Sequence, residues 1–302
     1  MEDFVSDVLS KINIDSAVYF KYCFYAPWGM GIPKGNKAQF HMVVKGRCWL
    51  LRPNKNPLPV SQGDVIVFPH GGAHELKSDF EVESMPGGEV VNCIVNGEEP
   101  FQGSEDNCTL ICGHFALDHD IRHPIIQNLP DCLIINGESY GRFDLLRNIA
   151  ENLIEELNEQ KPGYQLVTLR LADILLISVI RHYYLKNDRQ INFLKDPIIY
   201  EALNIMHANL AVNWNIEKII KELGISRTLF IEKFKKTMGE TPIKYLSRWK
   251  LNEARSYLKS SSEPIHQIGY AVGYQSEAAF IRAFKKEFAI SPHKFRLVTT
   301  DE

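Results

Sequence analysis

The sequence predicts an α+β fold with a small N-terminal β-barrel, a middle helical hairpin and an all-α C-terminal region that holds two helix-turn-helix units. Three observations lead to this prediction. Short β-branched and aromatic runs fill residues 15–135, apolar residues take helical spacing after Gly141, and an internal repeat occupies the end of the chain. We place the boundaries of the three regions at 1–140, 141–190 and 197–302.

The N-terminal region consists of strand-like runs separated by Gly, Pro and Asn. The runs are VYFKYCFYA, QFHMVV, RCWLLR, DVIVFP and CTLICGHFAL, and NKNPLP and MPGGEV are two of the expected turns between them. Many short strands at close spacing favour a small barrel or a sandwich.

The middle region contains two helical patterns. Apolar residues from Phe143 to Leu157 recur at spacings of three and four, which indicates an amphipathic helix. The next helix, about residues 165–186, is apolar on nearly every side, so it must be buried in the core or against a partner subunit. We expect a homodimer that packs these helices about a two-fold axis. Residues 187–196 have the composition of a linker.

The C-terminal region carries an internal repeat. The first copy is LGISRTLFIEKFKKTMGETPIKYL and the second is VGYQSEAAFIRAFKKEFAISPHKFRL. Phe230 matches Phe280, and Pro242 matches Pro292, with the same offset of 50 residues. Two copies of one helical pattern predict two similar helical units within a single domain.

Each copy has the signals of a helix-turn-helix unit. A short helix stops at Gly224 or Gly273, and Ser226 or Ser276 caps the helix that follows. Such a unit presents its second helix to the major groove of DNA. A long helix that opens at Thr241, with a polar N-cap, joins the two units. If both second helices face one side of a duplex, we expect them to lie about 34 Å apart.

Charge is distributed unevenly along the chain. The net charge is -3, yet the segment from Ala211 onward has 16 basic and 10 acidic residues, which leaves 18 basic and 27 acidic residues for the rest. A basic end on an acidic body is typical of a polyanion-binding module. We recognise no export signal and no apolar run of the ~20 residues that a membrane span needs. With six cysteines, this pattern predicts reduced thiols in the cytoplasm.

Helical spacing divides the second helix of each unit into inner and outer faces. The residues expected to face the core are Leu229, Phe230, Phe234, Phe280, Ala283 and Phe284. The helix caps and the outward residues expected to lie on DNA are Ser226, Arg227, Thr228, Ile231, Glu232, Ser276, Glu277, Ala278, Ile281 and Arg282. Arg282 is the strongest candidate for a base contact, because a guanidinium can bind guanine O6 and N7 together.

A second set of side chains suits the phosphate backbone, which positions a protein on DNA without reading its sequence. These cations are Lys235, Lys236, Lys244, Arg248, Lys285, Lys286, Lys294 and Arg296. The competing interpretation is two packed helix pairs whose lysines form a solvated face. Period, caps and charge sign agree with each other, which favours DNA binding.

Residues of about 197–297 resemble the DNA-binding domain of the AraC/XylS family of bacterial transcription regulators. The matching residues are Gly224-Ile225-Ser226-Arg227, Phe234-Lys235, Gly239, Thr241-Pro242, Tyr245-Leu246, Ile268, Gly273-Tyr274, Ser276-Glu277, Phe280, Arg282-Ala283-Phe284-Lys285-Lys286 and Ser291-Pro292-His293-Lys294-Phe295-Arg296. Ala289 departs from the pattern, because the family usually has glycine there. The resemblance implies base contacts from the outward residues given above.

The N-terminal region is similar to the cupin-type sensor domain of one AraC branch. Gly63, Pro69, Gly71 and His74 have the spacing of the second cupin motif, and His41 stands where the first motif has a metal histidine. The remaining ligands of the first motif are absent.

A metal site would need a third ligand beside His41 and His74. Cys112 or His114 offers one, because the two alternate with Cys108 on one face of a strand. The alternative is a pair of hydrogen-bonded pocket histidines. We favour the alternative, and therefore expect no metal, no cofactor and no catalysis.

The cysteines suggest a redox signal as a further possibility. Cys23 lies near Trp28 in the sequence, and Cys108 and Cys112 share a predicted strand. A thiolate near an aromatic pocket could sense oxidants if a histidine lowered its pKa. The alternative is that these cysteines are small buried hydrophobes.

Together these patterns predict a cytoplasmic, sequence-specific transcription regulator that binds double-stranded DNA as a homodimer, contacts RNA polymerase and responds to a small-molecule or oxidant effector. A cupin metalloenzyme with an accessory DNA-binding region is the main alternative, and an architectural DNA-binding protein without effector is another. The sequence leaves activation and repression open.

Overall fold

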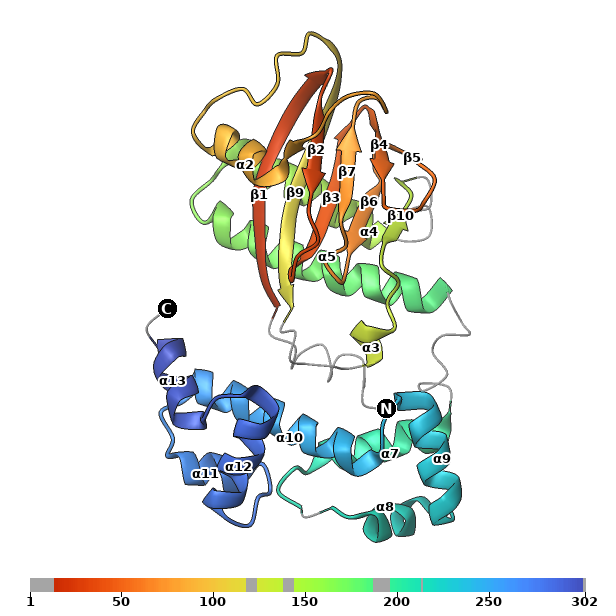
Figure 1. The fold of residues 1–302 in the computed structure, drawn as a ribbon, viewed down its shortest axis with the longest axis vertical. Helices are drawn as coiled ribbons and strands as arrows, with labels where there is room; N and C mark the ends of the chain where they lie inside the picture. The colour runs from red at the N-terminus through yellow and green to blue at the C-terminus, as the bar shows by residue number, and fades with distance from the viewer. Residues whose placement is uncertain (1–13, 118–123, 138–143, 187–195, 213, 301–302) are drawn as a thin grey trace. The chain divides into compact units, whose positions relative to one another are not determined.

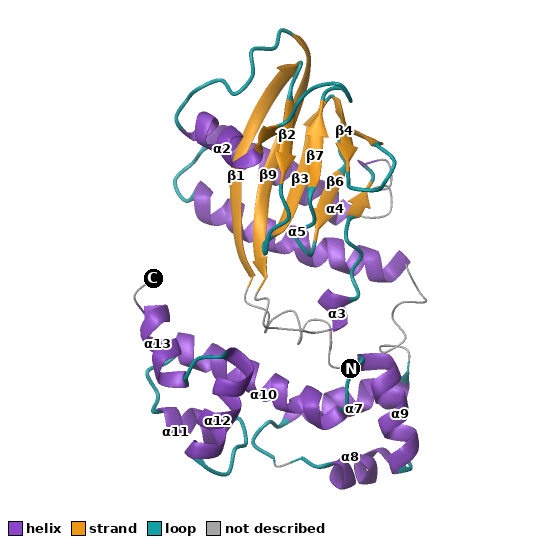
Figure 2. Ribbon diagram, viewed as in Figure 1, coloured by secondary structure: helices purple, strands orange, loops and turns teal. Residues whose placement is uncertain are grey.

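The computed structural model describes residues 14–117, 124–137, 144–186, 196–212 and 214–300. The chain divides into two compact units, one made mainly of residues 14–186 and the other mainly of residues 187–302. All described strands lie in the first unit together with several helices, and the described part of the second unit is helical, so the α+β class is confirmed (Figure 2). In the described residues, no helix has both the length and the apolar character needed to cross a bilayer.

Two five-stranded sheets form the barrel of the N-terminal unit (Figure 1). One has the order β1-β9-β3-β6-β10 and the other the order β5-β4-β7-β2-β8. All pairings are antiparallel except that of β2 with β8. The strands are β1 (Ile14–Ala26), β2 (Gly29–Ile32), β3 (Ala38–Lys45), β4 (Arg47–Leu51), β5 (Leu58–Ser61), β6 (Val65–Phe68), β7 (His74–Lys77), β8 (Met85–Pro86), β9 (Glu105–Leu117) and β10 (Leu133–Ile135).

Side chains from both sheets form the inner core of the barrel. Phe24 of β1, Leu50 of β4, Phe68 of β6 and Leu76 of β7 belong to this cluster and are almost completely buried. Alternation along each strand sends every second residue inward. Cys108 and Cys112 of β9 also belong to this inner set.

Four helices accompany the barrel, namely α2 (Gly87–Val95), α3 (Pro124–Gln127), α4 (Asp144–Glu159) and α5 (Tyr164–Lys186). The prediction of a turn at MPGGEV is wrong, because Met85 and Pro86 form β8 and Gly87 begins α2. Helix α5 packs against α4 and contacts both β1 and β10, the two edge strands of one sheet, so it crosses that sheet (Figure 1). Asp173 of α5 accepts a hydrogen bond from Ser16 of β1 at 2.5 Å.

Helix α5 is not buried on every side by its own unit. Leu175, Leu176 and Val179 are fully buried, whereas Leu166 and Leu185 are 59% and 60% exposed. Burial in the core of its own unit therefore does not cover the whole helix, and the alternative, burial against a partner subunit, stays a prediction. The exposed face combines apolar side chains with Arg170 and Arg181.

The C-terminal unit is entirely helical in its described part. Its helices are α7 (Pro197–Ala208), α8 (Ile216–Leu223), α9 (Arg227–Met238), α10 (Pro242–Ser260), α11 (Ile265–Ala271), α12 (Glu277–Phe288) and α13 (Pro292–Thr300). Helix α10 runs between the pair α8–α9 and the pair α11–α12 (Figure 1). Asp196, expected to end a linker, is instead the N-cap of α7 and accepts from the backbone N–H of Ile198. The rest of that expected linker, 187–195, lies outside the described residues.

Candidate DNA-binding and sensor sites

Serine hydroxyls fix the start of both candidate recognition helices. Ser226 Oγ accepts from the backbone N–H of Leu229, and Ser276 Oγ accepts from that of Ala279, each at 3.3 Å. Gly224 before the first of these caps has a φ of 65°, a left-handed conformation that suits glycine. These signals confirm the sequence prediction for both turns. Thr241, expected to cap α10, makes no side-chain capping bond.

Phenylalanines hold the recognition helices against their cores. Phe230 and Phe234 of α9, like Phe280 and Phe284 of α12, are fully buried. Leu229 is 42% exposed, so its expected core position is wrong. Phe230 and Phe234 are four residues apart and share one face of the helix, whereas the neighbouring Leu229 points to the outer side.

Most of the predicted DNA-facing residues lie at the surface of α9 and α12. Ile231 and Ile281 are half-buried at the edge of that surface. The exposed ones are Ser226, Arg227, Thr228, Glu232, Lys235, Ser276, Glu277, Ala278, Arg282, Lys285 and Lys286, and Lys244 of α10 and Lys294 of α13 are exposed as well. The spacing of the phenylalanines thus predicted most of the exposed residues, whereas Ile281 packs partly against the core that contains Phe280 and Phe284.

Three predicted DNA-contacting arginines have protein partners. Arg227 pairs with Glu217 of α8 at 2.5 Å, and both side chains are exposed. Arg248 forms a two-pronged pair with Glu240 in which both side chains are largely buried. Arg296 donates to the backbone carbonyl of Glu263 at 2.7 Å. The phosphate roles expected of Arg248 and Arg296 stay predictions, and Arg248 would have to leave its buried pair with Glu240 to contact DNA.

Two lysines that the sequence analysis missed have structural contacts. Lys233 of α9 pairs with Asp196 at 2.6 Å, which ties the first recognition helix to the start of α7. Lys250 of α10 is only 7% exposed and donates to the carbonyl of Val212 at 3.0 Å. Their positions within a basic helical pattern gave no sign of these contacts.

Inside the barrel, a buried chain of hydrogen bonds joins the predicted sensor residues. Cys112 Sγ lies 3.0 Å from His41 Nδ1, His41 Nε2 lies 2.8 Å from His74 Nε2, and His74 Nδ1 lies 2.8 Å from the carbonyl oxygen of Gly72. A carbonyl only accepts, so His74 Nδ1 must donate and its Nε2 must accept. His41 then donates through Nε2 and accepts at Nδ1 from the thiol of Cys112.

Burial keeps every member of this chain neutral. It lowers the pKa of His41 well below its usual value, and the neighbouring His74 adds to the effect. Burial also lowers the pKa of His74 to about 4, against a smaller opposing effect of the Gly72 carbonyl. The pKa of Cys112 is raised well above its usual value by burial and by Cys108. The condition set for a redox role, a thiol pKa lowered by histidine, is therefore not met at Cys112, which fits the alternative of a small buried hydrophobe.

The described residues contain no group of three or more His, Cys, Asp or Glu side chains placed to hold a metal ion. His41 and His74 instead use their facing nitrogens for each other. His114, the other weak ligand candidate, is buried beside the ring of Tyr19, with ring centroids 5.0 Å apart. The donor set of the barrel thus fits a hydrogen-bonded pair better than a metal centre.

Cys23 does not join the inner cysteines. It faces away from the inner core and lines a cavity of about 240 Å³ with Tyr25 and Phe101. Cys48 is the thiol near Cys108, close enough for a hydrogen bond that raises the pKa of Cys48 well above its usual value. The sequence had assigned no chemistry to Cys48.

Trp28 lies in the wall of a larger cleft of about 1190 Å³. Lys45, Arg47, Cys48 and Trp49 line the same cleft. The indole is fully buried, and its Nε1–H has no hydrogen-bond acceptor among the described residues. An unpaired buried donor costs free energy, about 1–3 kcal/mol, so Trp28 Nε1–H is a polar group that the described residues leave unsatisfied next to this cleft.

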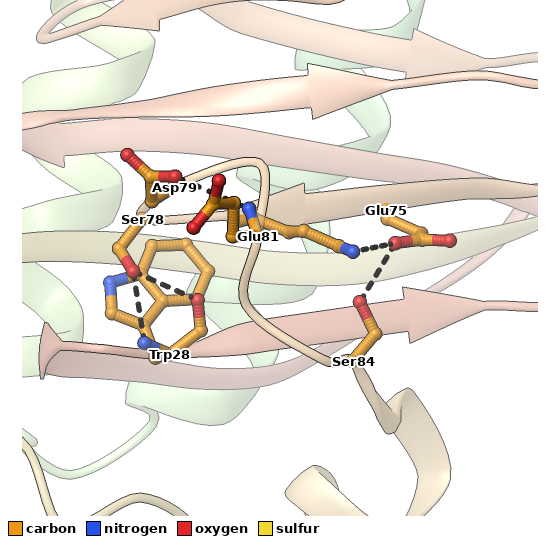
Figure 3. A network of polar contacts seen from close by, with 7 residues as sticks. Trp28, Glu75, Ser78, Asp79, Glu81 and Ser84 are labelled. Carbon is orange, nitrogen blue, oxygen red and sulfur yellow. Dashed lines mark hydrogen bonds and ion pairs between the residues drawn. The ribbon is translucent and has the colours of Figure 1, made fainter.

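Ser78 holds the backbone of Trp28 in place (Figure 3). Its hydroxyl accepts from the N–H of Trp28 at 3.0 Å and donates to the carbonyl of the same residue at 3.1 Å. Beside it, Glu75 accepts from Lys77 at 2.7 Å and from Ser84 at 2.9 Å. Phe24 stacks on the indole with ring centroids 4.9 Å apart. The backbone and the ring of Trp28 are therefore held in a fixed position.

Comparison with known proteins agrees with both halves of the chain. A family model described as Cupin matches residues 3–184, and a model described as a helix-turn-helix domain matches residues 219–297. A Streptomyces antibioticus protein described as an AraC-like transcription regulator is 25% identical over 299 residues, which cover 97% of this chain and 98% of the relative.

Two further relatives have the same character. The HTH-type transcriptional regulator AlkR of Acinetobacter baylyi is 25% identical over 309 residues, which cover 97% of this chain and 99% of that protein. A solved AraC-type DNA-binding domain from Chromobacterium violaceum is 32% identical, covers 35% of this chain and 94% of its own, and has a TM-score of 0.33. The chain belongs to the cupin family through its N-terminal domain and, with its C-terminal helix-turn-helix domain, is an AraC-type transcription regulator.

Proposed function

We propose that the protein binds specific duplex DNA sequences through α9 and α12, forms a homodimer through α5, and responds to a small molecule bound in the cleft at Trp28. In this proposal the barrel is a ligand-binding sensor domain and not an enzyme. Contact with RNA polymerase and a cytoplasmic location belong to the same proposal.

The observation that carries the DNA-binding proposal is the matched exposure of the two recognition helices. Arg282, Lys285 and Lys286 are exposed on α12, and Lys235 is exposed at the equivalent place on α9. None of these four side chains forms an ion pair with a described residue, so each is available for phosphate or base contacts.

The exposed apolar side chains of α5 support the proposed homodimer. Leu166, Ile174 and Leu185 are 59%, 43% and 60% exposed on one helix of the N-terminal unit. The first two are eight residues apart and the last follows eleven later, which keeps them near one helical stripe. A two-fold partner would bury the same stripe on both chains.

The unpaired donor of Trp28 supports a small-molecule effector with a hydrogen-bond acceptor, which would have to displace neighbouring side chains because the indole is fully buried. Lys45 and Arg47 are exposed in the lining of the cleft and together outweigh the charge of Asp79, so an acidic acceptor would find net positive charge there. The ligand acts by linkage, which means that it changes DNA affinity only as far as it binds one arrangement of the protein more tightly.

An oxidant remains the second candidate signal because Cys23 is a partly exposed thiol. The inner thiol of Cys112 is neutral and deeply buried, which makes it a slow nucleophile. We therefore assign any oxidant response first to Cys23, and expect Cys23→Ser to abolish it while basal DNA binding is retained.

Selection of bound sequences from a random duplex library, with the full chain, tests the DNA-binding proposal. Recovery of one shared sequence supports it, and recovery of unrelated sequences contradicts it. A reporter gene controlled by the recovered sequence then distinguishes the two signals. Wild type, Trp28→Phe and Cys23→Ser are each challenged with small molecules and with hypochlorite. We expect Trp28→Phe to lose the small-molecule response and Cys23→Ser to lose the oxidant response. Stoichiometric iron, manganese or nickel in the purified protein, together with turnover, would favour the metalloenzyme alternative.

A further inference from the structure

Lys250 occupies the middle of α10, the helix that joins the two helix-turn-helix units. Its side chain is almost completely buried, and its ammonium donates to the carbonyl of Val212 at 3.0 Å. Val212 belongs to the segment between α7 and α8, within the first unit. A buried ammonium is costly unless backbone or side-chain oxygens surround it, so this contact is a specific one.

The turn of the second unit comes to the same place. A Cβ atom at Gly273 would lie 2.3 Å from the carbonyl oxygen of Leu210 and 2.5 Å from Lys250 Nζ. Only glycine allows that approach, and its φ of 84° adds a second reason for glycine here. The Gly273 turn of the second unit therefore lies close to the Leu210–Val212 segment of the first unit, and the ammonium of Lys250 lies next to both.

Each unit otherwise has a core of its own. Ile268, Val272, Phe280 and Phe284 pack on the C-terminal half of α10 through Leu251, Ala254 and Leu258. The buried residues of the first unit are Ile199, Ala202, Leu203, Met206, Ile216, Ile219, Phe230, Phe234, Met238, Tyr245, Leu246 and Trp249. A single helix connecting two cores can bend and twist, whereas a second contact beside it limits both motions.

We propose that Lys250 is a positioning residue that fixes the rotational phase of α9 relative to α12 by joining the Leu210–Val212 segment to the Gly273 turn. This inference rests on the proposed DNA-binding function, because phase matters only if both helices enter one duplex. Successive base pairs differ by about 35° and ~3.4 Å, so a rigid pair of helices fits one spacing between its two subsites.

The test uses the full chain and the duplex recovered by sequence selection. Affinity is measured for that duplex and for a version with one base pair inserted between the two subsites. We expect the insertion to weaken wild-type binding at least about tenfold and to weaken Lys250→Met binding less than about threefold. Lys250→Arg keeps the charge and should keep most of the spacing penalty, and Lys250→Gln, which keeps a donor, should fall between.

Lys259→Met is the matched control, because it removes a positive charge from α10 at an exposed site. It should leave the spacing penalty unchanged. If Lys250→Met fails to fold, as judged by circular dichroism, Lys250→Gln decides the question.

A folded Lys250→Met or Lys250→Gln variant that keeps the full wild-type penalty overturns the inference, even if its overall affinity falls, because loss of stability alone weakens both duplexes equally. Failure to select any shared sequence would instead count against the proposed DNA-binding function.

Discussion

The two helix-turn-helix units are copies of one pattern, yet they differ where they would read bases. With the offset of 50, Arg227 of α9 corresponds to Glu277 of α12, and Glu232 corresponds to Arg282, so both charges are reversed. The lysines suited to phosphate are the same in both copies. A repeat that keeps its backbone-positioning cations and exchanges its base-facing charges can bind two different subsites in the same pose.

The supports of the two copies differ as well. Gly224 has open space where a Cβ would stand, whereas Gly273 is pressed against Leu210 and Lys250. Gly239 ends α9 in the left-handed conformation, and Ala289 ends α12 in the same conformation with a φ of 59°. Arg227 is paired with Glu217, whereas Arg282 forms no ion pair with any residue that the structure describes. The second copy is thus the more constrained in its turn and the less constrained in its base-reading arginine.

The largest difference should appear when each turn glycine is replaced by alanine. Gly224→Ala should lower the free energy of unfolding by about 1 kcal/mol, the cost of a left-handed non-glycine residue. Gly273→Ala should lower it by roughly 3 kcal/mol or more, because overpacking is added to that cost. Urea unfolding followed by the helical signal in circular dichroism measures both. Equal losses would mean that the Gly273 contact has no energetic weight.

The arginines should differ next. Arg282→Ala should cost about 1–3 kcal/mol of binding and relax discrimination at one base pair. Arg227→Ala should cost less than Arg282→Ala, because Arg227 must first give up its pair with Glu217, and an exposed pair of this kind is worth about 0–1 kcal/mol. Binding titrations with the selected duplex and single-base variants measure both. Equal losses on selected and random duplexes would refute base reading by Arg282.

The sequence was sufficient for features that depend on near neighbours in the chain. Serine caps, turn glycines and the spacing of Phe230, Phe234, Phe280 and Phe284 predicted the recognition helices, because these signals act within one or two helical turns. The class of the N-terminal barrel followed from strand-like runs, although short strands such as β2 and β7 escaped detection.

Contacts between distant segments could not be predicted. The bond between His41 and Cys112 depends on the register of β3 against β9, and the burial of Lys250 depends on a turn more than twenty residues away in the sequence. The pairing of Arg248 with Glu240 was similarly hidden, because a basic residue on a helix near DNA has the same pattern whether it is free or paired. Residue type and spacing predict that a helix forms, but whether one of its basic residues is free for DNA depends on its tertiary contacts.

The C-terminal ends of the recognition helices provide a smaller test of the comparison. Ala289→Gly should raise the free energy of unfolding by about 0.5–1 kcal/mol, because glycine relieves left-handed strain at some cost in unfolded-state entropy. Gly239→Ala should lower it by a similar amount. The same urea titration measures both, and a loss of stability in Ala289→Gly would show that the methyl group of Ala289 has a packing role that outweighs strain.

The smallest difference should be found between the phosphate-facing lysines. Lys235→Ala and Lys285→Ala should each weaken binding to selected and random duplexes alike, and each should reduce the slope of log affinity against log salt by about one. The two effects should be equal, because both lysines are exposed at equivalent positions of the repeat. Titrations at several salt concentrations measure the slopes. If only Lys285→Ala changes the slope, then α9 does not lie on the phosphate backbone as α12 does, and the two copies differ in pose as well as in the bases they read.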